Sequence, residues 1–205
     1  EVTWSSGSTE EENLFATAIE DGTTRQVTTL KGRETLPAWS PDGASLAFVH
    51  YSDSARLLVV SGNHAARNLG AIPYDGTSPP VWSPGSDGLL VSGRARYRRK
   101  SSAEFVPLHG ARTRIERFAD APIFLQWSRD TVTFVRHDAS LSLVLQPTGA
   151  GQPRELPRGP IETYYRDRAE LSPDGKQVAF GGRATDHGWR VWLQDVGAGE
   201  PRAGT

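Results

Sequence analysis

Residues 37–49 begin Pro37-Ala38-Trp39-Ser40-Pro41-Asp42-Gly43 and, two residues later, continue into Leu46-Ala47-Phe48-Val49. Three related stretches follow, beginning Pro80-Val81-Trp82-Ser83-Pro84, Leu125-Gln126-Trp127-Ser128-Arg129-Asp130 and Glu170-Leu171-Ser172-Pro173-Asp174-Gly175. The anchor residues Trp39, Trp82, Trp127 and Leu171 are 43, 45 and 44 residues apart. A period of this length is that of a four-stranded propeller blade. The sequence therefore predicts an all-β chain, a β-propeller of four-stranded antiparallel blades.

Each repeat divides into four short strands. The first strand carries the anchor, and a Ser-Pro-Asp-Gly turn leads to an apolar second strand. In the second copy we predict a turn two residues longer, with the insertion before Gly88. The third strands are predicted at Leu57–Val60, Glu104–Leu108, Leu141–Leu145 and Arg190–Leu193. A Gly-rich hairpin then leads to the fourth strand.

About four and a half blades fit into the 205 residues. We predict a single propeller segment, 1–205, with a partial blade at 1–33, whole blades at 34–77, 78–121 and 122–165, and a nearly complete blade at 166–205. The first blade lacks its innermost strand, so the segment is expected to belong to a ring of six or more blades. The sequence also has no Met, which favours an excerpt of a longer chain over a complete one.

Composition excludes several classes of protein. The net charge of −1, from 23 basic and 24 acidic residues, gives no overall field for nucleic acid. Without cysteine, neither a disulfide framework nor a cysteine-based zinc site can form. No apolar run approaches the ~18 residues that a spanning helix needs, so no membrane span is expected.

The repeat resembles the WD-like repeat of TolB-type propellers, in which a Trp or Phe precedes Ser-Pro-Asp-Gly and an aliphatic-Ala-Phe strand. The match is close at Trp39–Phe48 and Leu171–Phe180, whereas Trp127–Val135 lacks the Pro and Gly. The same repeat occurs in TolB proteins, which bind protein partners, and in the propeller parts of bacterial amidohydrolases and prolyl-oligopeptidase-like peptidases. The resemblance is specific for fold and implies export to the periplasm or secretion.

No stretch of the sequence forms a self-contained catalytic centre. A Gly-x-Ser-x-Gly nucleophile elbow, a His-Glu-x-x-His zinc site, a His-x-His pair and phosphate-binding glycine loops are all absent. The five histidines are scattered, and Glu10-Glu11-Glu12 is interpreted as a solvated loop. We therefore predict no catalytic residues, no metal and no cofactor within this chain, and whether the whole protein is an enzyme stays open.

Two structural roles are expected for the recurring large side chains. The tryptophans should wedge between adjacent blades, where a large ring excludes water. The arginines that follow the hairpin glycines are interpreted as solvated turn residues; they are Arg25, Arg67, Arg112, Arg154 and Arg202.

One end of the propeller is the best candidate for binding. Connections between second and third strands leave a propeller on the same face as connections between blades. On that face we predict loops containing Glu10–Glu12, 94–100, 164–168 and Asp186-His187. Arginine and tyrosine clustered on a rigid face suit a protein partner or an attached catalytic domain. The candidate residues are Arg94, Arg96, Arg98, Arg99, Tyr164, Tyr165, Arg166 and Arg168.

Two functions remain open from the sequence. The first is a non-catalytic propeller segment of a larger exported bacterial hydrolase, amidohydrolase-like or prolyl-oligopeptidase-like, which scaffolds or gates the active site. The second is a TolB-like protein-protein interaction or sensor module without enzymatic activity. A carbohydrate-active propeller ranks last, because Glu170 is the only clear acid on the predicted inner strands.

Overall fold

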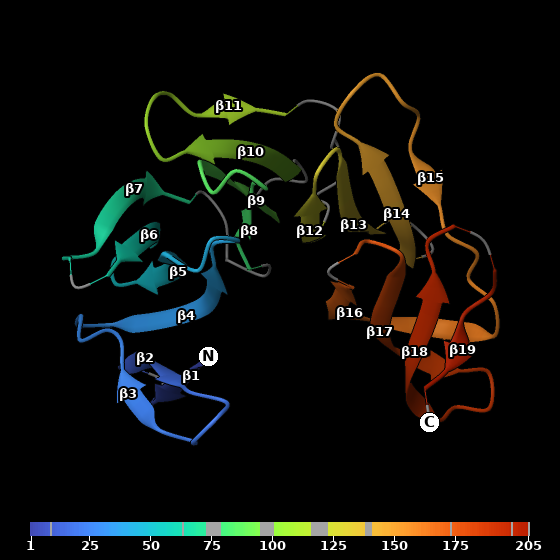
Figure 1. The fold of residues 1–205 in the computed structure, drawn as a ribbon, viewed down its shortest axis with the longest axis horizontal. Helices are drawn as coiled ribbons and strands as arrows, with labels where there is room; N and C mark the ends of the chain where they lie inside the picture. Colours follow the sequence, from blue (N-terminus) through green and yellow to red (C-terminus); the bar gives the residue numbers. More distant parts are fainter. Residues whose placement is uncertain are drawn as a thin grey trace.

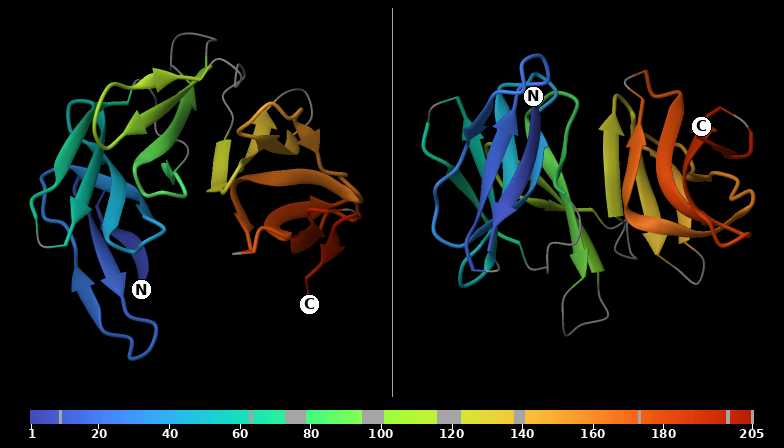
Figure 2. Two further views of the ribbon diagram at one scale, coloured as in Figure 1. Left: turned by 45° about the horizontal axis from the view of Figure 1, so that its top comes forward. Right: turned by 90° about the horizontal axis from the view of Figure 1, so that it is seen from below.

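The strands of the protein form successive, mainly antiparallel sheets that follow one another around an open arc (Figure 1). This computed structural model describes residues 1–8, 10–62, 64–72, 79–94, 101–115, 123–137, 141–172, 174–197 and 199–204. The N-terminal and C-terminal sheets lie at the two ends of the arc, and Figure 2 shows the opening between them from two further directions. Within the described ranges, no helix is long or apolar enough to cross a membrane.

The strands group into five blades, and the first two blades share one seven-stranded sheet, joined by a single parallel pair between Glu12 and Arg33. The first holds β1 (Val2–Gly7), β2 (Glu12–Thr17) and β3 (Thr24–Gln26). The second holds β4 (Arg33–Trp39), β5 (Ser45–Tyr51), β6 (Ala55–Ser61) and β7 (Arg67–Ala71). The third holds β8 (Val81–Trp82), β9 (Gly88–Arg94), β10 (Ser101–Pro107) and β11 (Thr113–Arg114).

The C-terminal half repeats this pattern twice. The fourth blade holds β12 (Ile123–Ser128), β13 (Thr131–His137), β14 (Leu141–Pro147) and β15 (Arg154–Glu155). The fifth holds β16 (Ile161–Leu171), β17 (Gln177–Ala184), β18 (Trp189–Asp195) and β19 (Arg202–Ala203). Blades two to five each have four strands in chain order, whereas the first has three, and β1 takes the place of a second strand.

The Ser-Pro-Asp-Gly turns are closed by their own side chains. In the second blade the hydroxyl of Ser40 donates to the Asp42 carboxylate (2.5 Å) and accepts from the amide of Ser45 (2.9 Å). Gly43 takes a left-handed conformation (φ 69°), which costs a residue with a side chain about 1–2 kcal/mol. The same pattern recurs at Ser172, Asp174 and Gly175 in the fifth blade.

The prediction of a longer turn in the third blade is wrong. The amide of Ser83 donates to the carbonyl of Gly88 across the turn, as Ser40 does to Ser45, so both turns have the same length. Ser86 (φ 56°) occupies the left-handed position that Gly43 holds in the second blade. The glycines in this copy stand at other positions of the turn, and aligning on them suggested an insertion that does not exist.

The core consists of layers between neighbouring blades rather than one central cluster. Trp82 lies in the layer between the second and third blades, where its indole N–H donates to the carbonyl of Ala38 (2.8 Å). Trp39 reaches back in the same way to the hydroxyl of Thr3 on β1 (2.6 Å). As predicted, these tryptophans wedge between blades, and each finds a polar partner for its N–H.

Candidate partner-binding face

The face predicted to bind a partner is the end of the propeller where second strands connect to third strands and where one blade connects to the next. We call this end the loop face. Antiparallel strand order brings both kinds of connection to it. Arg94 is the last residue of β9, where its backbone pairs with Ser101. Arg96, Arg98 and Arg99 lie outside the described residues.

The other half of the predicted site belongs to a strand rather than a loop. Tyr164, Tyr165, Arg166 and Arg168 are all part of β16, the inner strand of the fifth blade. Tyr164 pairs with Gly182, and the next pair joins Ala169 to Phe180, so β16 carries extra residues that its partner does not match. Such an irregularity redirects side chains and is common beside functional sites. The β-branched and aromatic residues Ile161, Thr163, Tyr164 and Tyr165 favour a strand, which explains the difference.

Described side chains near the start of β16 form a cluster of charges. The carboxylate of Glu162 forms an ion pair with the guanidinium of Arg183 (3.0 Å) and lies 3.3 Å from Nδ1 of His187. Arg158 donates from Nε to the carbonyl of Ile161 (2.7 Å). The cluster therefore gives the loop face of the fifth blade a set of ordered charges, held by the strand ends on either side.

The β17–β18 connection is fixed by an aspartate. The amide of Gly188 donates to the Asp186 carboxylate (3.0 Å), and Arg190 pairs with the same carboxylate. The backbone bond from Gly188, followed by the contact with Arg190, holds the pKa of Asp186 below its ordinary value. His187 is held in a left-handed conformation (φ 65°), and its imidazole side chain is mostly exposed on this face.

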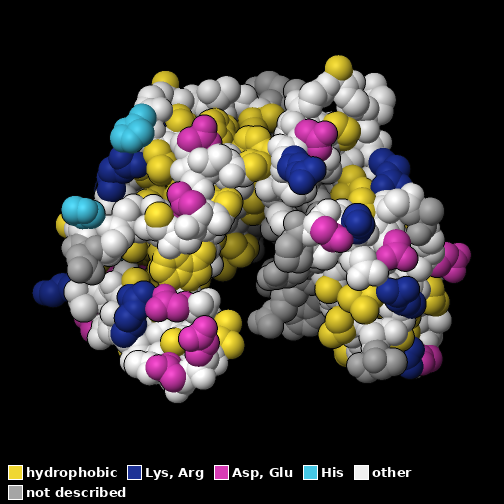
Figure 3. Space-filling model, in the orientation of Figure 1, with side chains coloured by type: hydrophobic (Ala, Val, Ile, Leu, Met, Phe, Trp, Pro, Cys, Tyr) yellow, Lys and Arg dark blue, Asp and Glu magenta, His cyan; other side chains and the backbone are white. Residues whose placement is uncertain are grey.

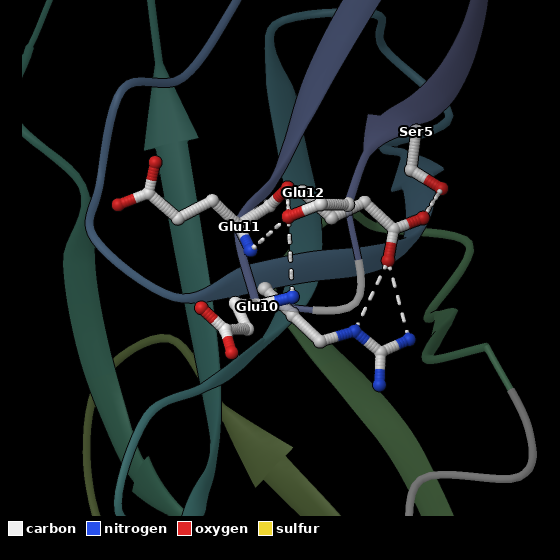
Figure 4. A network of polar contacts seen from close by, with 6 residues as sticks. Ser5, Glu10, Glu11 and Glu12 are labelled. Carbon is white, nitrogen blue, oxygen red and sulfur yellow. Dashed lines mark hydrogen bonds and ion pairs between the residues drawn. The ribbon is translucent and has the colours of Figure 1, made fainter.

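The acidic stretch of the first blade is a tied loop rather than an acid–base pair (Figure 4). The hydroxyl of Ser8 accepts from the amides of Glu10 (3.3 Å) and Glu11 (3.1 Å). Glu12 begins β2, where its carboxylate accepts from Ser5 (2.7 Å) and from Arg33 (3.2 Å). The interpretation of a solvated loop holds for Glu10 and Glu11, which are exposed, while Glu12 links β2 to the start of β4.

A buried acid on the inner strand was missed by the sequence analysis. Glu34 is fully buried on β4, where it pairs with His50 of β5. Its carboxylate accepts from the hydroxyl of Thr28 and from the amide of Leu30 (3.2 Å), in the connection between the first two blades. Burial raises the pKa of Glu34, and the bonds from Thr28 and Leu30 only partly oppose that effect. The sequence analysis named Glu170 as the only clear acid on the inner strands, which is wrong, because β4 begins at Arg33 and so includes Glu34.

The comparisons with known proteins agree on the fold. No known family model matches this chain. Over 162 residues, 75% of the chain, the sequence is 34% identical to the "uncharacterized peptidase YuxL" of Bacillus subtilis (strain 168). The crystal structure of TolB from Acinetobacter baumannii matches 94% of this chain, with a TM-score of 0.78 and 16% sequence identity. The fold is a TolB-like β-propeller.

The chain is shorter than the proteins it resembles. It spans 22% of YuxL and 48% of that TolB chain. It also resembles a puromycin-hydrolyzing peptidase of Mycobacterium tuberculosis, at a TM-score of 0.68 and 17% identity, over 94% of this chain and 32% of that one. The peptidase resemblance therefore concerns only one part of longer proteins.

Arginines on the outer edge of this TolB-like propeller join blades, which the sequence analysis did not predict. Arg112 of the third blade donates to the carbonyls of Ala71 (2.7 Å) and Leu69 (2.8 Å) on β7, the outer strand of the second. Arg154 donates to the carbonyls of Val196 and Gly197 (3.4 Å) in the fifth blade. The interpretation as solvated turn residues fits Arg25 better, because its exposed side chain pairs with Glu1 of the same blade.

The described histidines do not gather around a common point. His50 on β5 of the second blade bonds to the carbonyl of Lys31 (2.8 Å), and His187 between β17 and β18 of the fifth blade pairs with Glu162. Across the described ranges, no group of three or more His, Asp and Glu side chains could hold a metal ion. The chemistry that these residues offer is therefore charged and polar contact on the loop face.

Proposed function

We propose that this chain is the non-catalytic propeller part of a larger exported peptidase, in which it scaffolds and gates the active site. The observation that carries the proposal is the 34% identity to YuxL, which extends over 75% of this chain but only 22% of that peptidase. Of the two hydrolase classes that the repeat suggested, this similarity favours the peptidase. The proposed contact with the catalytic domain is made by the loop face at Arg94, Arg96, Arg98 and Arg99, and by the inner strand β16 at Tyr164, Tyr165, Arg166 and Arg168.

Hydrolysis of chromogenic peptides tests the catalytic part of the proposal. The longest polypeptide that carries these residues is expected to cleave the peptides, whereas residues 1–205 alone should not. Cleavage by residues 1–205 alone would overturn the non-catalytic assignment. Periplasmic or secreted localisation is tested by fractionating the host, and recovery in the cytoplasm would contradict it.

Gating is tested by changing the loop face in the same polypeptide. Replacing Arg96, Arg98 and Arg99 with alanine should change kcat/KM for long peptides more than for dipeptide substrates, because a gate discriminates by size. The matched control removes three exposed arginines from fourth strands, namely Arg25, Arg67 and Arg202. Equal effects of the two triple variants on both substrates would show that the loop face does not gate.

A TolB-like interaction module without catalysis is the second candidate. It is supported by the TM-score of 0.78 to TolB, which is higher than the 0.68 to the mycobacterial peptidase. For this function the longest polypeptide should cleave no peptide and should retain a host protein through the loop face. Loss of that protein in the loop-face triple variant, but not in the control, would support it.

A further inference from the structure

The two blades at the ends of the arc each leave an apolar face uncovered. On the first blade, Val2 and Trp4 of β1 are 55% and 41% exposed. On the fifth blade, Trp189 and Val191 of β18 are 56% and 60% exposed. Figure 3 shows hydrophobic side chains at the surface of both arms beside the opening. We call these the first end face and the last end face.

The repeat shows what normally covers the last end face. Val191 pairs with Gly181, one residue beyond the second-strand Phe180, and the same place in the preceding blades is held by Leu57, Ala103 and Leu143. These three residues are at most 2% exposed. Leu57 packs with Trp82 and Leu89 of the following blade, so this place in the repeat faces the next blade along the chain.

The first end face corresponds to the opposite side of a blade, the side that faces the previous blade along the chain. Trp4 pairs with Phe15 in the same way as Phe48 pairs with Leu58 in the second blade. Trp4 therefore holds the place that a second-strand residue holds in each of the other blades. These equivalent residues are at most 7% exposed: Phe48, Val91, Phe134 and Phe180. Phe48 packs with Leu14 of the preceding blade. This place in the repeat therefore faces the previous blade.

A polar detail also indicates a missing neighbour at the first blade. The indole of Trp82 donates to a carbonyl on the inner strand of the blade before it. Trp39 bonds instead to the side chain of Thr3, because among the described residues the first blade has no inner strand. The backbone edge of β1 that faces the middle of the arc has no described strand paired to it, and such an edge is a template for strand addition.

We propose that the two end faces are the two halves of blade-to-blade interfaces, each covered by a further blade of the same repeat within a longer polypeptide, with a strand added along β1. The lengths of the related proteins support further blades as the cover of the two end faces. The chain spans 48% of the TolB chain and 22% of YuxL. Propellers close with about four to eight blades, so one to three more would complete these five. Two copies joined end to end would make ten, which is beyond that range.

The absence of cysteine makes thiol labelling a direct test. Val191→Cys and Val2→Cys are made separately in the longest polypeptide that carries these residues. Ile19→Cys is the exposed control, since Ile19 is 75% exposed in a hairpin outside both faces. Ala103→Cys is the buried control, at the same place in the repeat as Val191. The label is a small maleimide, and its rate is followed by intact mass.

The proposal predicts that the thiols of Val191→Cys and Val2→Cys react at least about tenfold more slowly than the thiol of Ile19→Cys, since buried thiols react only through opening of the structure. The slow rate should not change on dilution. Labelling of both end-face variants at the rate of the exposed control would overturn the proposal. Protection that disappears on dilution would also overturn it, because the cover would then be a second copy. The labelling rate does not depend on peptidase activity, so this test can succeed or fail independently of the proposed function.

Discussion

At the scale of single residues, arginine side chains join the outer edges of neighbouring blades. Arg112 supplies both terminal nitrogens to carbonyls of β7, and Nη1 also lies 3.5 Å from the Glu104 carboxylate. The planar guanidinium can serve all three acceptors at once, which a lysine ammonium at the end of a flexible stem cannot do as well.

Replacing Arg112 with alanine should therefore destabilise the protein. Hydrogen bonds from a charged donor contribute about 1.5–3 kcal/mol each at most, and partial exposure reduces this, so we expect a loss of about 1–3 kcal/mol in the free energy of unfolding. Urea unfolding measures it. Arg202→Ala is the control, because Arg202 is 62% exposed and only approaches Asp195 at 4.0 Å. Equal losses in the two variants would contradict an inter-blade role for Arg112.

The buried acid Glu34 should make stability depend on pH. Its pKa is raised by burial, so the folded state favours the protonated carboxyl. The stabilising contribution is then fully present below the ordinary pKa of 4.5 and is lost as the pH rises through the raised folded value. The side chain of Glu34→Gln carries no charge at any of these pH values, so the variant does not lose stability in this way as the pH rises. The variant should gain stability relative to the unchanged protein as the pH increases from about 4.5 to 7.

Asp42 provides a control of opposite sign. The hydrogen bond from Ser40, followed by that from the Ala44 amide, lowers the pKa of Asp42. Its contribution is present above the ordinary value of 3.8 and is lost as the pH falls through the lowered value. The difference between Asp42→Asn and the unchanged protein should thus be flat from about pH 4.5 to 7. A flat difference for Glu34→Gln as well would refute the assignment.

At the scale of elements, two turns of equal length offer a reciprocal experiment. Gly43 and Ser86 hold the same left-handed position in the second and third blades, and a Cβ at Gly43 would meet no atom within 4 Å. Gly43→Ser should cost about 1 kcal/mol of unfolding free energy from backbone strain alone. Ser86→Gly should gain up to about 1 kcal/mol, less the weak bond that Ser86 accepts from the amide of Asp42 (3.4 Å). Thermal unfolding compares them, and changes of the same sign would disprove the equivalence.

The order of the strands could be predicted from the sequence because the anchors recur and the apolar strands follow each anchor at a short distance. Longer-range features could not. Nothing near Glu34 indicates that the loop 27–30 folds over it, and the run from Ile161 continues the strand through Tyr164–Arg168 although its charges suggest a connection. Arg112 contacts a strand more than 40 residues earlier, which a local pattern cannot reveal. The loop-face assignment of Arg96, Arg98 and Arg99 stays a prediction.

At the scale of the whole molecule, stability is distributed over a series of layers between neighbouring blades. A blade at either end touches one neighbour, whereas an inner blade touches two, and such a series opens from its ends. The layers are unequal. The first blade contributes Leu14 to the layer with Leu46, Phe48 and Leu58 of the second. Between the fourth and fifth blades, Leu143, Leu145 and Leu156 meet Val178, Phe180 and Trp192.

Hydrogen exchange of the 205-residue chain should resolve this order. Amides of β2 are expected to exchange first, those of β17 later and those of β5 last, with at least about tenfold between β2 and β5. Leu14→Ala removes buried contact worth about 2–5 kcal/mol and should accelerate exchange in β2 while leaving β17 unchanged. Equal rates in the three strands would mean that the arc unfolds as one unit. If the blades instead open one at a time from the ends, covering an end face should slow the opening of the blade that carries it. That blade would then contact a neighbour on both sides and would no longer be the first to open.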